Sequence, residues 1–418
     1  MYFDYAAATP LEKRVITAME PYFTDEFYNP SAPYSGARQV KNDYQNAKHR
    51  IAQVIGAREA EIIMTAGATE SINLAINGFF GQSFLPSEPS VSAGNFPKLS
   101  SDNFTENPRG IRVPKNDLTK KIKIITSAIE HPAVLNAAKA VNGKILPVDK
   151  FGRIDIKMLE KGITDDTVFV SIGYANNEIG TVQPIKEIAE IIAKVRENRA
   201  ERNIKTPIYF HTDASQAPGM LDINVARLGV DMMTLNAGKC YGPKQVGCLY
   251  VRAGVELSPL IYGGGQESGL RSGTENVAGT VGFATALEIA EKKRKTEVKR
   301  LEVLRSDLDK FIISFIPGAV VNGHKKYRLP NIINFSVPGL DAERAVFALD
   351  QKDIQVATGS ACSANKGNRS HVLKAIGLSD EMADGSIRIS FGRGTAKTQI
   401  EKLKPVLVEV IENEKKLS

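Results

Sequence analysis

The stretch from residue 208 to residue 244 constrains the fold of this chain most strongly. Ile208–Phe210 is an apolar, β-branched and aromatic run, and the polar segment after it contains Asp213. A second apolar run, residues 231–235, leads to Lys239. Such runs are typical of buried strands, and α/β sheets hold ligands at the carboxyl ends of their strands. The stretch therefore predicts an α/β protein with Asp213 and Lys239 at the mouth of a sheet.

An amine and a carboxylate placed in this way suit one cofactor. A lysine amine can form a Schiff base with an aldehyde, and a carboxylate beside a pyridine nitrogen keeps that nitrogen protonated. Asp213 and Lys239 could therefore hold pyridoxal phosphate (PLP). Spacing alone leaves a second interpretation open, in which both are ordinary surface residues.

The composition restricts the class of protein. A chain of 418 residues is too long for one ordinary hydrophobic core, so we expect at least two subdomains. Apolar residues make up 42% and charged residues 24%, as in soluble globular proteins. The net charge of +7 is small beside 54 basic and 47 acidic side chains, and direct nucleic-acid binding is not expected. The N-terminus has no secretory or transit pattern and no run is long enough to cross a bilayer, which predicts a cytosolic protein without a membrane partner.

The three cysteines, an odd number without metal-like spacing, argue against a disulfide framework and against a metal site. Cys240 and Cys248 lie in apolar runs and are expected to be inert core thiols. Cys362 lies in a loop of small and polar residues before a helix at Val372, where a thiolate is accessible. A lone cysteine in such a loop is also compatible with no function.

Three further strands deliver small or polar residues to a strand end. The first leads into Ala66–Ser71, whose small residues precede a helix and can bring backbone N–H groups to a phosphate, although an ordinary tight turn has the same pattern. The strand at 123–126 leads to His131, and the strand at 169–172 leads to Asn177. A histidine just past a strand end is also commonly a structural residue.

The segment from 81 to 121 differs in kind, since it has five prolines, six serines and no apolar periodicity. We expect an exposed loop or a disordered insert. Because it leaves a helix that starts at the cofactor end and enters a parallel strand, both of its ends should lie on the face away from the predicted site. Deletion of residues 85–115 should therefore spare turnover.

Several motifs occur together in this chain: HTDASQ, NAGKCYGPKQVGCLYVR, GATES, SAIEHPAV, GGGQE…RSGTEN, GSACS and SIRIS. In combination the chain resembles the class V aminotransferase-like PLP enzymes, and specifically the cysteine desulfurases. The resemblance extends from FDYAAATP at the N-terminus to SIRISFGR. The GSACS run, without the shorter histidine-rich loop of the other branch, resembles the long-loop branch that serves iron–sulfur assembly.

The resemblance implies the PLP-dependent transferase fold type I, an α/β architecture. A large domain over residues 15–265 would carry a mostly parallel seven-stranded sheet and the exposed insert at about 81–121. A smaller α/β domain would combine residues 1–14 with 266–418 and carry the catalytic-cysteine loop. The threonine of the RSGTEN motif, here Thr274, reaches the phosphate of the neighbouring subunit in the family, which implies a homodimer with active sites at the interface.

The resemblance also implies roles for individual residues. Lys239 would bond to the cofactor and remove the Cα proton, His131 would stack on the pyridine ring and move protons, and Cys362 would take the sulfur. The residues implied in cofactor binding are Ala68, Thr69, His131, Asn177, Asp213, Gln216, Asn236, Lys239 and Thr274. The residues implied in substrate binding are Asn29, Asn177 and Arg388. Of these, Arg388 would bind the α-carboxylate of the substrate. The alternative for Arg388 is a side chain on an edge strand that extends to water.

The implied reaction removes sulfur from L-cysteine and gives L-alanine and a persulfide on the enzyme. A sulfur-acceptor protein, either an iron–sulfur scaffold or a tRNA-thiolation protein, would then receive the sulfur. Two alternatives stay open. The first is another class V PLP enzyme, such as a selenocysteine lyase or an aminotransferase, and the second is a scaffold homologue that has lost the cofactor.

Two positions depart from the family pattern. The family usually has Ser or Thr three residues before the lysine and His immediately before it, both donating to the phosphate, whereas this chain has Asn236 and Gly238. Asn236 can still donate, but Gly238 has no side chain. Losing one hydrogen bond to a charged group costs about 1.5–3 kcal/mol, so we expect PLP binding weaker by roughly tenfold or more.

Overall fold

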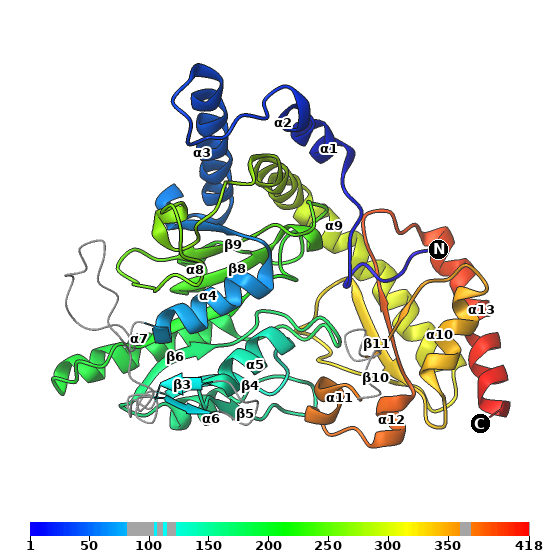
Figure 1. Cartoon of the computed structure of the whole chain (residues 1–418). Helices are drawn as coiled ribbons and strands as arrows, with labels where there is room; N and C mark the ends of the chain where they lie inside the picture. The colour runs from blue at the N-terminus through cyan, green and yellow to red at the C-terminus, as the bar shows by residue number, and fades with distance from the viewer. Residues whose placement is uncertain (82–103, 107–111, 115–122, 360–368, 418) are drawn as a thin grey trace.

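The largest element of the fold is a seven-stranded sheet in the order β1-β9-β8-β7-β6-β4-β5 (Figure 1). The computed structural model describes residues 1–81, 104–106, 112–114, 123–359 and 369–417. Strands β8, β7, β6, β4 and β5 run parallel, and β9 runs antiparallel to β8 and β1. The strands are β1 (Ile62–Thr65), β4 (Lys123–Ser127), β5 (Lys144–Leu146), β6 (Thr167–Ser171), β7 (Tyr209–Asp213), β8 (Met232–Asn236) and β9 (Gly247–Val251). The prediction of an α/β fold with a mostly parallel seven-stranded sheet is confirmed.

Helices cover both faces of this sheet, because successive side chains of a buried strand point to opposite sides. In β9, Cys248 and Tyr250 pack into one core, whereas Leu249 and Val251 pack into the other. The first core is covered by α3 (Ser35–Ile55), α6 (Ile156–Gly162), α7 (Ile185–Glu201) and α8 (Val225–Leu228), and the second by α4 (Ala68–Gly81) and α5 (Pro132–Ala140). Each parallel strand therefore ends in a loop at one common edge.

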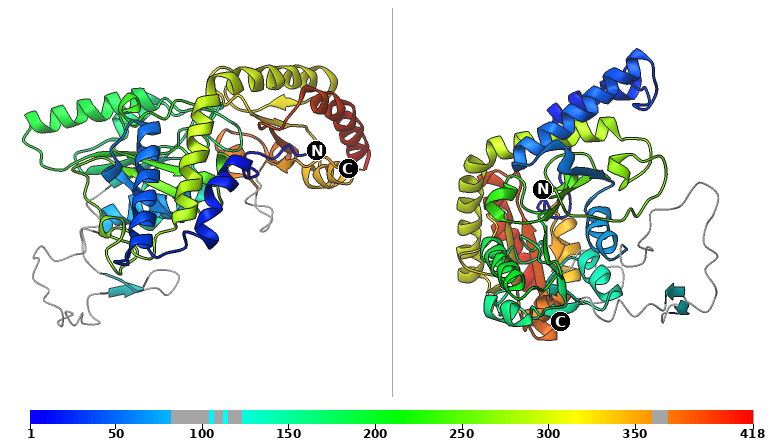
Figure 2. Two further views of the ribbon diagram at one scale, coloured as in Figure 1. Left: turned by 90° about the horizontal axis from the view of Figure 1, so that it is seen from above. Right: turned by 90° about the vertical axis from the view of Figure 1, so that its left-hand side faces the viewer.

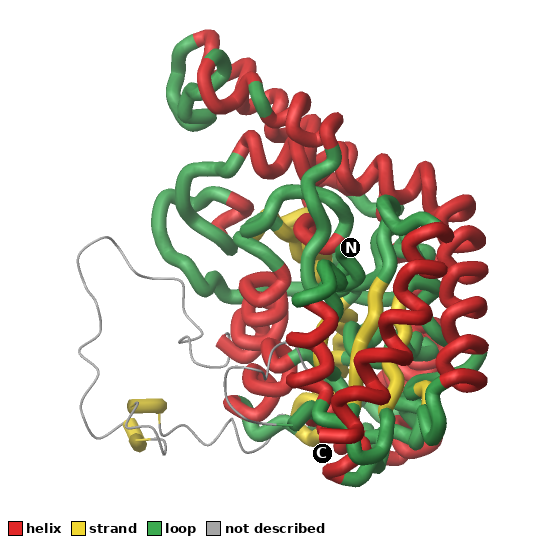
Figure 3. The backbone as a smooth tube through the Cα atoms, turned by 90° about the vertical axis from the view of Figure 1, so that its right-hand side faces the viewer, coloured by secondary structure: helices red, strands yellow, loops and turns green. Residues whose placement is uncertain are grey.

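A second, antiparallel sheet has four strands in the order β10-β11-β13-β12. Its elements are β10 (Val320–Val321), β11 (Ile332–Ser336), β12 (Ala357–Thr358) and β13 (Ser386–Ser390), with the helices α10 (Ala342–Asp350), α11 (His371–Ala375), α12 (Asp380–Asp384) and α13 (Lys397–Leu417). Helix α13 packs against α9 and α10. Figure 3 shows helices beside strands in the half of the molecule that ends at the C-terminus. Helix α9 (Val277–Phe315) runs from one sheet to the other, since its start packs in the first core and Leu301–Ile312 pack in the core of the small sheet (Figure 2).

The N-terminal residues lie along the small sheet before the chain crosses to the large one. Phe3 is fully buried in the core of the small sheet. Tyr2 and Asp4 form single bridges with Gln355 and Ser390. The helices α1 (Lys13–Met19) and α2 (Pro21–Thr24) then lead to α3. Residues far apart in the sequence therefore meet beside β13.

The insert between α4 and β4 contains more regular structure than its composition predicts. β2 (Phe104–Glu106) pairs antiparallel with β3 (Arg112–Pro114), because aromatic and β-branched residues in these short runs favour strand pairing. The rest of the insert lies outside the described residues. Gly81 ends α4 at the far end from Ala68, and Lys123 begins β4, so the insert leaves and enters at the edge predicted for it. Within the described part of the chain, no helix has the length and apolar character that a membrane crossing requires, and the cytosolic location stays a prediction.

Candidate active site

A cavity of about 390 Å³ lies at the carboxyl edge of the parallel strands and is lined by residues of both sheets. The predicted site residues that line it are Ala68, Thr69, His131, Asn177, Asp213, Gln216, Asn236, Lys239 and Arg388. Asn29 and Thr274 are exposed and do not line it, and the side chain of Asn29 accepts a hydrogen bond from Ser31 N at 2.9 Å. Cys362 lies outside the described residues.

Asp213 closes β7 and lines the cavity. Its Oδ1 accepts hydrogen bonds from Ser215, at 2.9 Å from the backbone N and 2.6 Å from the hydroxyl. His211 is fully buried, and its ring nitrogens lie 2.9 Å from Ser171 Oγ and 3.0 Å from Thr234 Oγ1. Burial lowers the pKa of His211 to about 4, although the charge of Asp213 opposes this, so the imidazole is neutral. Asp213 therefore ends a strand whose buried histidine, His211, is uncharged and hydrogen-bonded.

Lys239 ends the short 3₁₀ helix η5 (Ala237–Lys239), which directly follows β8. Its Nζ donates to the backbone oxygens of Ala6 at 2.8 Å and Ala7 at 2.6 Å. Gln216 Nε2 donates to the same Ala6 oxygen at 3.1 Å. The amine and the amide therefore meet at the N-terminal segment, which forms one wall of the cavity.

His131 is the N-cap residue of α5, and this position determines where its proton lies. Its Nδ1 accepts a hydrogen bond from Ala133 N at 3.1 Å, so the neutral ring carries its proton on Nε2. Burial lowers the pKa of His131, the charge of Asp213 opposes this shift, and Lys239 adds to it. The ring is therefore a neutral imidazole with Nε2–H as its available donor.

Glu130 also lines the cavity, and the sequence analysis assigns it no role. It is 4% exposed, and its carboxylate accepts hydrogen bonds from Ser127 Oγ at 2.5 Å and from Gly173 N at 2.9 and 3.0 Å. Burial raises the pKa of Glu130 to about 7, the hydrogen bonds oppose this, and the charge of Asp213 adds to it. An acid immediately before a histidine at a strand end is the sequence signal that points to this residue.

The start of α4 offers a cradle for an anion. Its first N–H groups have no partners within the helix and carry the positive end of the helix dipole. Gly67 has φ of +132°, which residues with a Cβ rarely adopt, and Thr69 lines the cavity. On the opposite side, Asn236 Oδ1 accepts from Gly238 N at 3.0 Å, which leaves its Nδ2 group as a donor. A Cβ at Gly238 would meet Asn236 Oδ1 at 3.4 Å and Lys244 Cα at 3.7 Å, which are ordinary van der Waals contacts.

Arg388 is 1% exposed and lines the cavity from β13. Its Nη2 donates to Asp4 Oδ1 at 2.6 Å and its Nη1 donates to Asn177 O at 3.0 Å. Its Nε is buried without a hydrogen-bond partner among the described residues. The alternative of an edge-strand arginine that extends to water is wrong, because β13 lies between β11 and β12. Sequence reasoning finds the arginine and misses its partner Asp4.

The segment that carries Cys362 is not described, but residues on either side of it are fixed near Arg388. On one side, β12 pairs with β13 and places Ala357 opposite Arg388. On the other side, Ser370 Oγ donates to the buried carboxylate of Glu178. Ala357 and Ser370, one on each side of this segment, are therefore bonded to parts of the chain that include or adjoin residues of the cavity lining.

The two described thiols are buried in the core, as the sequence predicts. Cys240 is 1% exposed and Cys248 is fully buried. Burial raises the pKa of the Cys240 thiol to about 12 and raises that of Cys248 further. Neither forms a thiolate near neutral pH.

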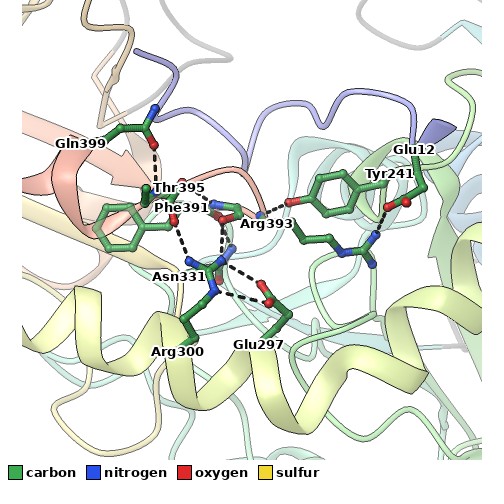
Figure 4. A network of polar contacts seen from close by, with 11 residues as sticks. Glu12, Tyr241, Glu297, Arg300, Asn331, Phe391, Arg393, Thr395 and Gln399 are labelled. Atoms are coloured by element: carbon green, nitrogen blue, oxygen red, sulfur yellow. Dashed lines mark hydrogen bonds and ion pairs between the residues drawn. The ribbon is translucent and has the colours of Figure 1, made fainter.

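A network of polar contacts holds the turn after Lys239 (Figure 4). Tyr241 has φ of +68°, a left-handed conformation that costs about 1–2 kcal/mol for a residue other than glycine. Its hydroxyl accepts from Arg393 N at 2.6 Å, and the guanidinium carbon of Arg393 lies 4.1 Å from the centre of its ring. Arg393 also pairs with Glu12 at 3.1 Å, and Glu12 N donates to Tyr241 O at 3.1 Å. The lysine turn is therefore locked to both the N-terminal segment and the end of β13.

Comparison with known proteins places this geometry in a family. The aminotransferase class-V family model matches residues 1–91 and 111–403. Because the match spans most of the chain, the protein belongs to the class-V aminotransferase family. Residues 92–110, which the match leaves out, fall within the insert.

Within this family the chain matches cysteine desulfurases over its full length. It is 38% identical to cysteine desulfurase IscS 1 of Archaeoglobus fulgidus, with 100% of this chain and 98% of the relative covered. It is 39% identical to cysteine desulfurase IscS of Dictyoglomus turgidum, with 100% and 96% covered. The protein is thus a member of the cysteine desulfurase family, as the motifs predict.

Solved structures agree with this assignment. A NifS-like protein superposes with a TM-score of 0.83 at 31% identity, with 99% of both chains covered. SspA in complex with cysteine superposes with a TM-score of 0.72 at 33% identity, with 93% of this chain and 98% of that chain covered. The predicted fold type I is therefore confirmed.

Proposed function

We propose that this protein is a PLP-dependent cysteine desulfurase that transfers sulfur from L-cysteine to Cys362 and releases L-alanine. The observation that carries the proposal is the convergence of Lys239, Asp213 and Arg388 on one cavity. Binding of a pyridine aldehyde requires an amine for the aldehyde and a carboxylate for the ring nitrogen. Binding of an amino acid requires a cation for its α-carboxylate, and a guanidinium suits this planar group.

The residues around the cavity fit PLP. Lys239 would hold the aldehyde carbon, Asp213 the pyridine nitrogen and Gln216 the phenolic oxygen, while the neutral ring of His131 would stack on the pyridine. The phosphate would be held by Ala68, Thr69 and the first N–H groups of α4, with Asn236 as a further donor. When bound, PLP supplies an aldehyde and an electron-withdrawing ring.

The protein's own groups would then position the amino acid and move its proton. Arg388 and Asn177 hold the α-carboxylate, which fixes the Cα–H bond relative to the amine of Lys239. This amine, released when the amino acid binds, takes the Cα proton. Asp213 keeps a proton on the ring nitrogen throughout, because its carboxylate is fixed by Ser215 and cannot turn away.

Sulfur transfer would use the thiolate of Cys362. The thiolate attacks the sulfur of the bound amino acid, an S–S bond forms and the Cβ–S bond breaks. The electron pair of the broken bond would stay on Cβ, which takes up a proton, and Cα would regain the proton that it lost to Lys239. The Lys239 amine would then displace the product as L-alanine. The anchors at Ala357 and Ser370 support this role, since they hold the flanks of the cysteine segment beside the carboxylate clamp.

We further propose a homodimer. The side chains of Phe23 and Phe27, four residues apart, are 65% and 66% exposed. Large apolar side chains that are exposed close together are typical of surfaces that bind another protein. Thr274 is exposed and does not line the cavity of its own chain, while Arg271 in the same loop pairs with Glu70 of α4 at 2.9 Å. This loop is thus anchored at its base and presents Thr274 to a neighbouring subunit.

The domain division fits the same proposal. Residues 15–265 would form the large PLP-binding domain, and residues 1–14 with 266–418 the small domain that carries the cysteine loop. The packing of Phe3 in the core of the small sheet supports the assignment of the N-terminal residues. The sulfur acceptor would be a separate protein, either an iron–sulfur scaffold or a tRNA-thiolation protein.

The test is incubation of the purified protein with L-cysteine and excess dithiothreitol, with alanine and sulfide measured together. The dithiothreitol reduces the persulfide on Cys362 and so releases its outer sulfur as sulfide. We expect both products in equal amounts, and Cys362→Ser should abolish sulfide release while it keeps the absorbance band of bound PLP. An aminotransferase would give a keto acid, and a selenocysteine lyase would act on selenocysteine in preference to cysteine. A protein without a yellow chromophore would favour the scaffold interpretation and overturn the proposal.

A further inference from the structure

One short segment of the N-terminus contacts three of the proposed ligand-binding groups. Ala6 and Ala7 accept hydrogen bonds from Lys239, and Ala6 also accepts from Gln216. Asp4, two residues earlier, accepts from Arg388 at 2.6 Å. The segment therefore reaches both the amine and the carboxylate clamp.

Asp4 approaches Arg388 from outside the cavity. Arg388 lines the cavity, whereas Asp4 does not, and the side chain of Asp4 is 19% exposed. The two Nη atoms of Arg388 are held by Asp4 on one side and by the backbone oxygen of Asn177 on the other. These two contacts fix the plane of the guanidinium, and the buried Nε has no hydrogen-bond partner in the part of the chain that the structure describes.

The position of Asp4 is itself held by two anchors. Tyr2 OH donates to the backbone oxygens of Asp4 at 2.8 Å and of Ala8 at 2.9 Å. Ala6 N donates to Ser390 Oγ at 2.9 Å, two residues along β13 from Arg388. The carboxylate and the guanidinium thus belong to one rigid unit in which Asp4 has little freedom to turn.

We propose that Asp4 is a positioning residue that orients Arg388 for the α-carboxylate of the amino acid, and so selects α-amino acids over amines that lack a carboxylate. A planar guanidinium binds a carboxylate well only when its plane and edge are already aligned. Asp4 is the only carboxylate within ion-pair distance of Arg388 among the described residues. The inference rests on the proposed function, because it assumes that Arg388 meets the substrate carboxylate.

The test compares two ligands that differ only in the carboxylate. L-alanine and ethylamine are titrated into the PLP-loaded enzyme, and binding is followed by the change in cofactor absorbance. Asp4→Ala should weaken L-alanine binding about tenfold and leave ethylamine binding unchanged. Asp4→Asn keeps an oxygen acceptor for Nη2 and should bind L-alanine within about threefold of the wild type. Glu409→Ala is the matched control, since it removes the carboxylate of an exposed ion pair with Lys352 that does not line the cavity, and it should leave the alanine-to-ethylamine ratio unchanged.

A second variant keeps the test decisive if Asp4→Ala does not fold. Asp4→Glu retains the charge that pairs with the buried arginine, but its extra methylene displaces the guanidinium, so L-alanine binding should again fall while ethylamine binding stays. Equal loss for both ligands, or no loss for either, in the folded variants would overturn the positioning role. If the wild type itself binds no PLP or forms no alanine from cysteine, the proposed function fails instead.

Discussion

Replacement of Gly238 with His should strengthen the hold of the protein on its cofactor. The position directly precedes Lys239, and its backbone N donates to Asn236, which lines the cavity. The nearest atoms to a Cβ built there are Asn236 Oδ1 at 3.4 Å and Lys244 Cα at 3.7 Å, which are ordinary van der Waals contacts. Gly238 is not among the residues with positive φ, so a side chain introduces no backbone strain. The Cβ of a histidine can therefore be accommodated at this position without displacing its neighbours.

The size of the effect follows from one hydrogen bond to a doubly charged phosphate. Such a bond contributes about 1.5–3 kcal/mol, which corresponds to roughly a tenfold to 150-fold change in the dissociation constant. The wild type has Asn236 as a side-chain donor beside the N–H groups of α4, so it should bind PLP and lose it measurably during prolonged dialysis. The His variant should retain PLP over the same period.

The assay is the absorbance of bound PLP during dialysis of the wild type, Gly238→His and Gly238→Ala. The alanine variant is the matched control, because it adds the Cβ without a donor and should lose cofactor like the wild type. Full retention by the wild type would refute the reasoning, since another group would then have replaced the imidazole. Equal behaviour of the histidine and alanine variants would show that no new hydrogen bond forms.

Three further predictions concern the insert and two buried carboxylates, Glu130 and Asp231. Deletion of residues 85–115 should leave the rate of alanine formation within twofold of the wild type, because the insert joins the sheet at the edge opposite the cavity; loss of PLP would contradict this. Burial raises the pKa of the Glu130 carboxyl from 4.5 to about 7, so the folded protein binds this proton more tightly than the unfolded chain does. The free energy of unfolding of the wild type, measured by urea titration, should therefore fall relative to that of Glu130→Gln as the pH rises from about 4.5 through 7. Asp231 is fully buried and pairs with Arg196 and Arg252. Because Asp231→Ala leaves these two arginines without their buried partner, it should lower the free energy of unfolding, measured by urea denaturation, by about 3 kcal/mol. A decrease below about 1 kcal/mol would contradict this prediction.

The part of the site that sequence reasoning finds lies at strand ends. Asp213, Lys239, His131 and Asn177 each follow a run of apolar residues, and β strands with a common direction bring such positions together at one edge. The pattern is local, because a few residues before each position are enough to recognise the strand.

The contacts that sequence reasoning misses join residues that are distant in the chain. Asp4 and Arg388 are 384 positions apart, and neither has a local pattern that identifies the other as its partner. Glu130 resembles any other acid until burial against Gly173 changes its proton affinity. For Asn29 and Thr274, a single chain offers no contact with the cavity, so their predicted roles depend on a second subunit.

The placement of the two halves of the site relative to each other depends on the N-terminal segment. Lys239 belongs to the seven-stranded sheet and Arg388 to the four-stranded sheet, so neither sheet alone determines the distance between the amine and the carboxylate clamp. The segment that contains Asp4 and Ala6 is bonded to both, and the Arg393 contacts lock the same region to the lysine turn. A site that must align a Cα–H bond with an amine needs this distance to be fixed to within about 0.5 Å. The first residues of the chain are therefore part of the catalytic framework, and loosening them should reduce turnover before it reduces stability.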